Sequence, residues 1–287
     1  MKKISVLLLC VMVMTAMLAV SSFAGATSNT SFDIPKAAVS PVIDAEMTGD
    51  EWNGALVRKL NADNMDEITN AGIPMTEASF YFMWDDAGLY FFADVINDTS
   101  FNEQPAAGQG SYNSGNGVQL CIYASSDLEG SVPGSMFFFS LCPFANDGNP
   151  YIGDHHTYSD GNSGVDVTEA VIASAETNDG YTIECFIPAE VFAKTNPAIE
   201  IKEGTVLPMA NIVMFREDGA QALFCDTAWF SAVNSNKYTL AASEVPTVDD
   251  TPAEDQPSAP QTADIISVAA LIAVSAFGAA AVVSKKK

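Results

Sequence analysis

Carboxylates are the side chains of this sequence with the widest scope for chemistry. The 287 residues include 36 aspartates and glutamates against 12 lysines and arginines. Carboxylate oxygens are hard ligands that suit calcium. Asp is also common in turns that hold no ion, so each position has a purely structural interpretation beside the metal one. The metal hypothesis is a structural calcium ion, and its predicted ligands are Asp85, Asp94 and Asp98.

Motifs for catalysis are absent from the sequence. It contains no Gly-x-Ser-x-Gly, no His-Glu-x-x-His and no cysteine paired with a suitable histidine base. A glycosidase needs two carboxylates a set distance apart, but among 36 acids a pair can always be chosen, so this pattern has no specificity. Zinc is disfavoured because His155 and His156 are the only histidines. We expect a protein that is not an enzyme.

Short strand-like segments must position any site. Nine runs rich in aromatic and β-branched residues are separated by turn residues, without an α/β alternation. Alternation places Leu89 and Phe91 on a core face of one run, and Ile183, Cys185 and Ile187 on a core face of another. The pattern predicts an all-β fold, an antiparallel two-sheet sandwich of the jelly-roll type. The predicted strands are 79–83, 89–96, 118–124, 136–142, 165–173, 181–187, 206–215, 222–230 and 238–241.

One short helical turn is expected near the start of the domain. Thr48-Gly49-Asp50-Glu51 matches the capping box, in which the threonine and the glutamate exchange hydrogen bonds. Trp52 would then point onto the sandwich, and we predict structural roles for Trp52 and Trp84. The loop 97–117, rich in Gly, Asn, Ser and Gln, is too polar for a strand and is a candidate functional loop.

Both ends of the chain carry export and membrane patterns. Two lysines, an apolar run and Ala24-Gly25-Ala26 predict a signal peptide over 1–26. At the other end 20 residues without a charge precede three lysines, so 265–287 is predicted to be a transmembrane helix with a basic tail. Between them we expect a folded domain over 27–242 and an extended acidic Pro/Thr linker over 243–264.

The exported part is strongly acidic. Without the two ends, seven basic residues face 36 acidic ones, a net charge of −29. Such a surface repels nucleic acid, so we expect no nucleic-acid partner. Four cysteines remain, which permits two disulfides or buried thiols. Because each lies in an apolar run, we predict buried thiols at Cys121, Cys142, Cys185 and Cys225.

Three segments of the sequence combine aromatic residues with glycine or charged residues. One is 84–90, Trp-Asp-Asp-Ala-Gly-Leu-Tyr, with Pro41 to Glu46 upstream. The others are Gly180 to Pro188, which has the form Gly-Tyr-x-x-Glu-x-x-Ile-Pro, and Lys237-Tyr238 with Leu240 near the end of the domain. In this order they resemble the family 9 carbohydrate-binding modules and their DOMON-like relatives, and the resemblance covers nearly the whole folded region.

This resemblance implies a non-catalytic β-sandwich that binds calcium structurally and holds glucose- or xylose-based saccharides between two aromatic rings. A pyranose offers C–H faces to such rings and hydroxyls to polar side chains at the rim. On this basis the expected ligand-binding residues are Tyr112, Asn116, Gln119, Arg216 and Trp229.

The sequence departs from the family pattern at two places. The family has Asp-x-Val-Glu after a loop tryptophan, whereas this chain has Asn116-Gly117-Val118-Gln119 with Tyr112 upstream. Between Trp229 and Tyr238 the loop is short and lacks the family's additional tryptophan. Both departures weaken the expected clamp.

A further resemblance concerns the anchor. Residues 259–263, Ala-Pro-Gln-Thr-Ala, resemble the Gram-positive sortase signal Leu-Pro-x-Thr-Gly, with alanine at its first and last positions. A sortase would join Thr262 to the wall; without one, the helix would stay in the membrane. Either outcome places the domain at the cell surface, on the extracellular side of the plasma membrane or on a Gram-positive type of wall.

The expected function is a surface-anchored carbohydrate-binding module that holds plant-type poly- or oligosaccharides without its own catalysis. One alternative is an adhesive or structural cell-envelope sandwich that has lost sugar binding. The least favoured alternative is a haem-binding DOMON-like protein, which would need axial ligands such as Met209 and His155.

Overall fold

The computed structural model describes residues 29–69, 72–96, 106–107, 114–128, 135–154, 167–217, 220–227 and 231–242. These residues form two β-sheets with almost no helix, which confirms the all-β prediction. The chain divides into two compact units, 1–245 and 246–287, and the second lies outside the described residues. The predicted domain boundaries therefore stay predictions.

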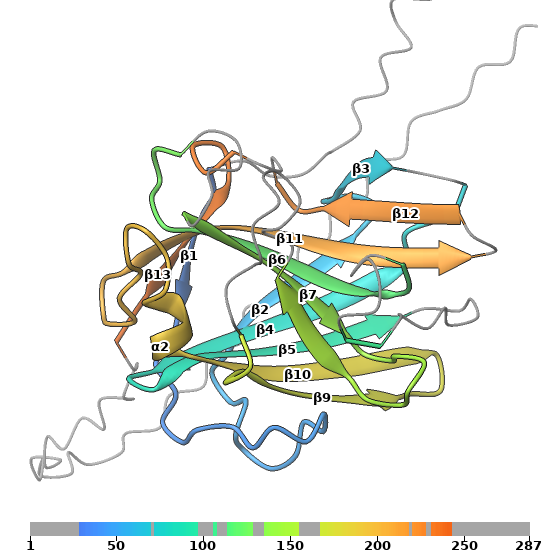
Figure 1. Cartoon of the computed structure of the whole chain (residues 1–287), viewed down its shortest axis with the longest axis horizontal. Coiled ribbons are helices and arrows are strands. Elements are labelled where there is room, and N and C mark those ends of the chain that lie inside the picture. The colour runs from blue at the N-terminus through green and yellow to red at the C-terminus, as the bar shows by residue number, and fades with distance from the viewer. Residues whose placement is uncertain are drawn as a thin grey trace, which may run out of the picture. The chain divides into compact units, whose positions relative to one another are not determined.

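The smaller sheet has five strands joined by antiparallel pairing (Figure 1). Its strand order is β2 (Leu56–Asn61), β4 (Glu77–Asp85), β5 (Gly88–Ile96), β10 (Gly180–Pro188) and β9 (Val171–Glu176). The β4–β5 hairpin turns tightly at Asp85, whose Oδ1 accepts the amides of Ala87 at 2.8 Å and Gly88 at 3.2 Å. Gly88 is required because a Cβ there would lie 2.2 Å from the carbonyl oxygen of Ile187 on β10.

The larger sheet has eight strands around the long strand β11 (Val206–Glu217). On one side β11 pairs with β6 (Gly117–Tyr123), and the order continues through β7 (Met136–Cys142) to β8 (Tyr151–Asp154). On its other side β11 pairs first with β13 (Asn236–Leu240) and then with β12 (Ala220–Cys225). The edge strands are β8, β1 (Ser31–Ile34), which pairs parallel to β13, and β3 (Asp66–Thr69), which pairs with β12.

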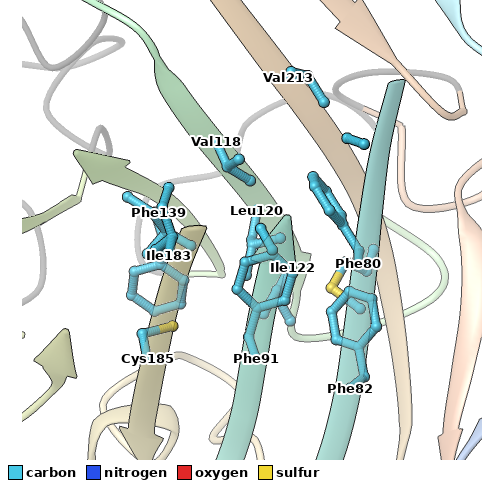
Figure 2. Packing of buried hydrophobic residues seen from close by; sticks show 14 of the residues in the cluster. Phe80, Phe82, Phe91, Val118, Leu120, Ile122, Phe139, Ile183, Cys185 and Val213 are labelled. Atoms are coloured by element: carbon cyan, nitrogen blue, oxygen red, sulfur yellow. The ribbon is translucent and has the colours of Figure 1, made fainter. Parts of the chain in front are cut away.

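The inner faces of the two sheets share one apolar core. Figure 2 shows Leu120 and Ile122 of β6 beside Phe91 of β5, and Phe139 of β7 beside Ile183 and Cys185 of β10. Leu89, Phe91, Ile183, Cys185 and Ile187 all lie in this core and are fully buried, as the alternation predicted. The two-sheet sandwich is therefore confirmed, with β1–β13 as a parallel exception to its antiparallel pairing.

The predicted N-terminal helical turn is wrong. Residues 49–54 form turns, and Gly49 has φ +61°, a left-handed conformation that an α-helix cannot contain. Glu51 still reaches back to the Thr48 amide at 3.2 Å, so half of the capping box forms without the helix. The described helix is α2 (Ala189–Phe192), which follows β10.

Four strands were not predicted: β1, β2, β3 and β8. Three of them are four-residue edge strands, and β2 carries adjacent Arg58 and Lys59. Short or charged strands give a weak apolar pattern. Two predicted boundaries also shift, from 165–173 to Val171–Glu176 in β9 and from 222–230 to Ala220–Cys225 in β12.

All four predicted thiols are free and buried. Cys185 lies in the inner core, whereas Cys121 and Cys225 lie on the outer face of the larger sheet. Within the described residues no helix is long and apolar enough to cross a membrane. The predicted anchor, 265–287, lies outside those residues.

Candidate functional site

Gln119 and Arg216, two of the expected ligand residues, belong to the outer face of the larger sheet. An apolar layer covers this face, and all of its main members are buried. We call it the outer cluster; it consists of Cys121, Tyr123, Met136, Phe138, Ala210, Ile212, Met214, Leu223, Cys225 and Ala232.

Gln119 lies in β6 beside the outer cluster. Strand register pairs it with Ser140 of β7 on one side and Ile212 of β11 on the other. Its Nε2 donates to Ser140 Oγ at 2.8 Å, and the Gln119 side chain is 1% exposed. In this arrangement Gln119 links two strands beneath the surface.

Asn116 and Arg216 are brought together by the structure. Asn116 precedes β6, and its Oδ1 accepts the Arg216 backbone amide at 3.0 Å. Asn116 is buried, whereas Arg216, near the end of β11 and paired with Gln221 of β12, is half-buried. Arg216 is therefore the described member of the predicted set that a ligand could reach most directly.

The two predicted aromatic residues, Tyr112 and Trp229, lie outside the described residues. The strands next to them in the sequence are described: β6 follows Tyr112, and β12 precedes Trp229. These two strands flank β11 on opposite sides, and Ile212 pairs with both Gln119 and Cys225. The two strands that connect to these loops, β6 and β12, are therefore both direct neighbours of β11.

The predicted metal ligands do not converge. Asp85 pairs with Gly88 at the start of β5, whereas Asp94 lies six residues further along that strand. At ~3.3 Å per residue the two carboxylates are about 20 Å apart and cannot share one ion. Asp98 lies outside the described residues, and within those residues no group of three or more His, Cys, Asp or Glu side chains could hold a metal.

Asp85 has a structural role in the hairpin. Its Oδ2 accepts the hydroxyls of Ser40 at 2.7 Å and Tyr90 at 2.9 Å. Burial of the carboxylate works to raise its pKa, but these hydrogen bonds outweigh burial and hold the pKa below its ordinary value. Trp84, the preceding residue, is 1% exposed and donates from Nε1 to the Ala241 carbonyl at 2.8 Å. Its predicted structural role is confirmed.

Glu184 is a buried carboxylate whose role the sequence did not reveal. It lies on the outer face of β10 and accepts the amides of Asp44 at 2.9 Å and Ala45 at 2.8 Å. Its Oε1 also accepts the indole N–H of Trp52 at 3.0 Å. Burial, in spite of these bonds, raises the pKa of Glu184 above its ordinary value. Glu184 thereby holds residues 44–52, which we call the covering segment, against the outer face of the smaller sheet.

Trp52 is confirmed as structural, but it packs outside the sheet and not in the inner core. It forms a small cluster with Met83, Tyr90 and Phe92. Its ring meets Phe92 edge-on at 5.7 Å between centroids. Figure 1 shows the covering segment, in blue, along the outside of the smaller sheet.

A second buried polar group connects the two sheets. Asp226, which is fully buried, accepts Asn211 Nδ2 at 2.8 Å, Tyr238 Oη at 3.3 Å and the Arg58 guanidinium at 3.4 Å. Burial raises the pKa of Asp226, and the Arg58 charge opposes that rise. The Arg58 guanidinium also lies 3.8 Å above the Phe32 ring. This network holds β2 to the larger sheet. The signal in the sequence that could have revealed it is Arg58, a charged residue at a core-facing position of β2.

The haem alternative receives no support from Met209, which is fully buried among apolar side chains of the inner core. His155 lies outside the described residues.

No family model and no curated protein matches the sequence. A family 9 carbohydrate-binding module from Caldicellulosiruptor kristjanssonii, solved with cellotriose, matches with a TM-score of 0.54 at 19% identity, over 80% of this chain and 100% of the module. This chain has a family 9 type of fold.

Two further structures agree. A family 9 module from Caldicellulosiruptor kristjanssonii with glucose matches with a TM-score of 0.52 at 19% identity, covering 75% of this chain and 98% of that one. A protein from Bacteroides uniformis ATCC 8492, provisionally classed as carbohydrate-binding, matches with a TM-score of 0.52 at 11% identity, covering 74% and 100%. The family 9 fold therefore extends over nearly all of the described sandwich.

Proposed function

We propose that this protein is a non-catalytic carbohydrate-binding module that holds glucose- or xylose-based saccharides at the cell surface. The observation that carries the proposal is the likeness to a module solved with cellotriose, all of whose length is matched. The family 9 neighbours are binding modules and not enzymes, which fits the absence of catalytic motifs from the sequence.

The binding site that we propose lies at the end of β11 on the outer face of the larger sheet. Arg216 supplies hydrogen-bond donors there, and Tyr112 and Trp229 supply aromatic faces from the two loops attached to β6 and β12. Asn116 positions Arg216 through its backbone amide, and Gln119 holds β6 to β7 below the site. In this proposal Asn116 and Gln119 are buried residues that support the site and do not contact the sugar.

One observation favours the second candidate, an adhesive or structural envelope domain. Asn116 and Gln119, which the resemblance assigned to the ligand, are each 1% exposed and bonded within the protein. A sandwich that has lost its sugar site would show the same burial.

Calorimetry with cello- and xylo-oligosaccharides separates the two candidates. The full chain should be kept in a detergent without sugar head groups, because alkyl glycosides would compete. We expect saturable binding that Arg216→Ala and Tyr112→Ala each weaken at least about tenfold, the loss of one good contact. Glu203→Ala, an exposed residue elsewhere, is the matched control. A folded chain that gives no heat would favour the envelope domain.

A structural calcium ion is a further proposal, which comes from the family resemblance. Asp85 and Asp94 could not bind it together, because the strand register keeps them apart. Repeating the titration in calcium and in a chelator, together with thermal unfolding, tests it. A calcium-dependent rise in the melting temperature supports the ion, and identical curves would remove it.

Surface display is proposed from the sequence patterns at both ends. In a Gram-positive host, external protease should remove 27–242 from intact cells. Release of the domain by wall-digesting enzyme would indicate sortase linkage through Thr262, whereas retention in the membrane would indicate the helix anchor.

A further inference from the structure

A groove lies on the outer face of the smaller sheet, on the opposite sheet from the site proposed above. Its volume is about 370 Å³, within the range of small-ligand sites. One wall is the covering segment at Ala45, Glu46 and Met47, and the other is the end of β9 with Glu176 and Thr177. The floor is formed by β4, β5 and β10.

Both walls of the groove are fixed by hydrogen bonds. The Ala45 amide donates to Glu184 at 2.8 Å, and the Ala45 carbonyl accepts the Thr182 hydroxyl at 2.8 Å. The opposite wall is closed by the β9–β10 turn, where the Thr177 amide donates to the Gly180 carbonyl at 3.0 Å. These hydrogen bonds hold both walls in place, so the groove is a fixed feature of the fold.

The floor is aromatic on one side and polar on the other. Strand register aligns Tyr81 with Phe92, and the two rings meet edge-on at 5.9 Å between centroids. Phe92 is almost fully buried, whereas Tyr81 is half-buried. The next row of the sheet aligns Asp94 with Thr182. The accessible part of the Tyr81 ring thus lies one residue row away from the hydrogen-bonding groups of Asp94 and Thr182.

The polar rim is rich in hydrogen-bond acceptors. The acidic residues Glu46 and Asp94 line the groove, and no lysine or arginine does so in the part of the chain that is described. Lys59 faces outward in the same row as Asp94, but it lies two strands away across Ser79. Carboxylates accept hydroxyl hydrogens well and repel anionic ligands.

We propose that this groove is a second carbohydrate site, which takes a neutral pyranose unit of an oligosaccharide. The C–H face of the sugar packs on Tyr81, and its hydroxyls donate to Asp94 and Glu46. The same acceptor rim excludes uronic and sulfated saccharides. The inference does not depend on the first site, because the two lie on different sheets.

The burial of Asp94 and the negative charges near it favour a ligand whose hydroxyl groups donate hydrogen bonds to this carboxylate. Burial raises the pKa of this carboxyl, and the negative charges of Asp179 and Glu77 raise it further. A hydroxyl that donates to Asp94 would relieve part of that repulsion. Replacing Asp94 should consequently leave the fold intact.

Calorimetry of the full chain with cellotriose and xylotriose, in sugar-free detergent, tests the proposal. We expect Asp94→Ala to remove one binding event or weaken it at least about tenfold, without lowering the melting temperature. Glu203→Ala, an exposed acid outside the groove, should bind like the parent chain. Trigalacturonate should neither bind nor displace cellotriose from the groove.

The outcomes separate this site from the first one. Two binding events, one lost in Asp94→Ala and the other in Arg216→Ala, support both sites. One event lost only in Asp94→Ala supports the groove and removes the first site. Binding that is unchanged in Asp94→Ala, absence of any heat, or displacement of cellotriose from the groove by trigalacturonate would overturn the groove proposal.

Discussion

The two outer faces of the sandwich are covered in different ways. On the smaller sheet, one carboxylate, Glu184, fixes a segment of the chain through three hydrogen bonds and leaves a groove beside it. On the larger sheet, an apolar cluster covers the face, and polar residues such as Gln119 are bonded between neighbouring strands. The difference indicates that the first face depends mainly on one polar anchor, assisted by the Thr182 hydroxyl and by the packing of Trp52, whereas the second is held by many small contacts.

The largest effect should come from removing the anchor. Glu184→Ala leaves two backbone amides and the Trp52 indole N–H without their acceptor, so we expect a loss of about 3–5 kcal/mol in the free energy of unfolding. Denaturant unfolding measures it, and tryptophan fluorescence should shift to the red. Glu184→Gln is the control, since it retains one carbonyl acceptor and should lose less. A loss below about 1 kcal/mol in the alanine variant would contradict the single-anchor account.

A smaller effect is expected on the other face. Gln119→Ala removes one buried hydrogen bond to Ser140, and we expect a loss of about 1–2 kcal/mol. A double-mutant cycle with Ser140→Ala isolates the pairwise energy. If Gln119→Ala were as damaging as Glu184→Ala, the contrast between the faces would be wrong.

The smallest effect concerns pH. Because burial raises the folded-state pKa of Glu184 above its ordinary value of 4.5, its contribution to stability is present in full below that value and is lost as the pH rises through the raised pKa. Asp226 and Asp94 act in the same direction. We therefore expect a larger free energy of unfolding at pH 5 than at pH 8.

The matched control for the pH effect is Glu184→Gln, which should reduce the difference between the two pH values. Asp85 does not act in this window, because its pKa is lowered from 3.8 and its contribution is lost only in stronger acid. Equal slopes in the parent and the variant would show that Glu184 is not responsible.

Much of the fold could be predicted from the sequence, because its central strands are long and apolar. The segments that carried the family resemblance are also those that set the fold: Trp84 and Asp85 fix a hairpin, and Glu184 fixes the covering segment. Edge strands such as β3 and β8 escaped prediction because their short sequences carry little periodicity.

The site was harder to predict, since resemblance locates positions and not exposure. Asn116 and Gln119 lie where the family pattern placed ligand residues, yet cross-strand partners bury both. Asp85 and Asp94 are close in sequence but lie at opposite ends of a hairpin, so their spacing predicted a cation site that the strand register prevents. The groove was not foreseen, because Ala45 and Glu176 are 131 positions apart in the numbering of the chain.

The most direct test of saccharide binding is a crystal structure of the protein soaked with cellotriose. The account predicts a sugar beside Arg216 at the end of β11, with a ring stacked on Tyr112 or Trp229. Well-ordered crystals that bind no sugar at this end of β11, at a concentration that saturates family 9 modules, would contradict the proposed site.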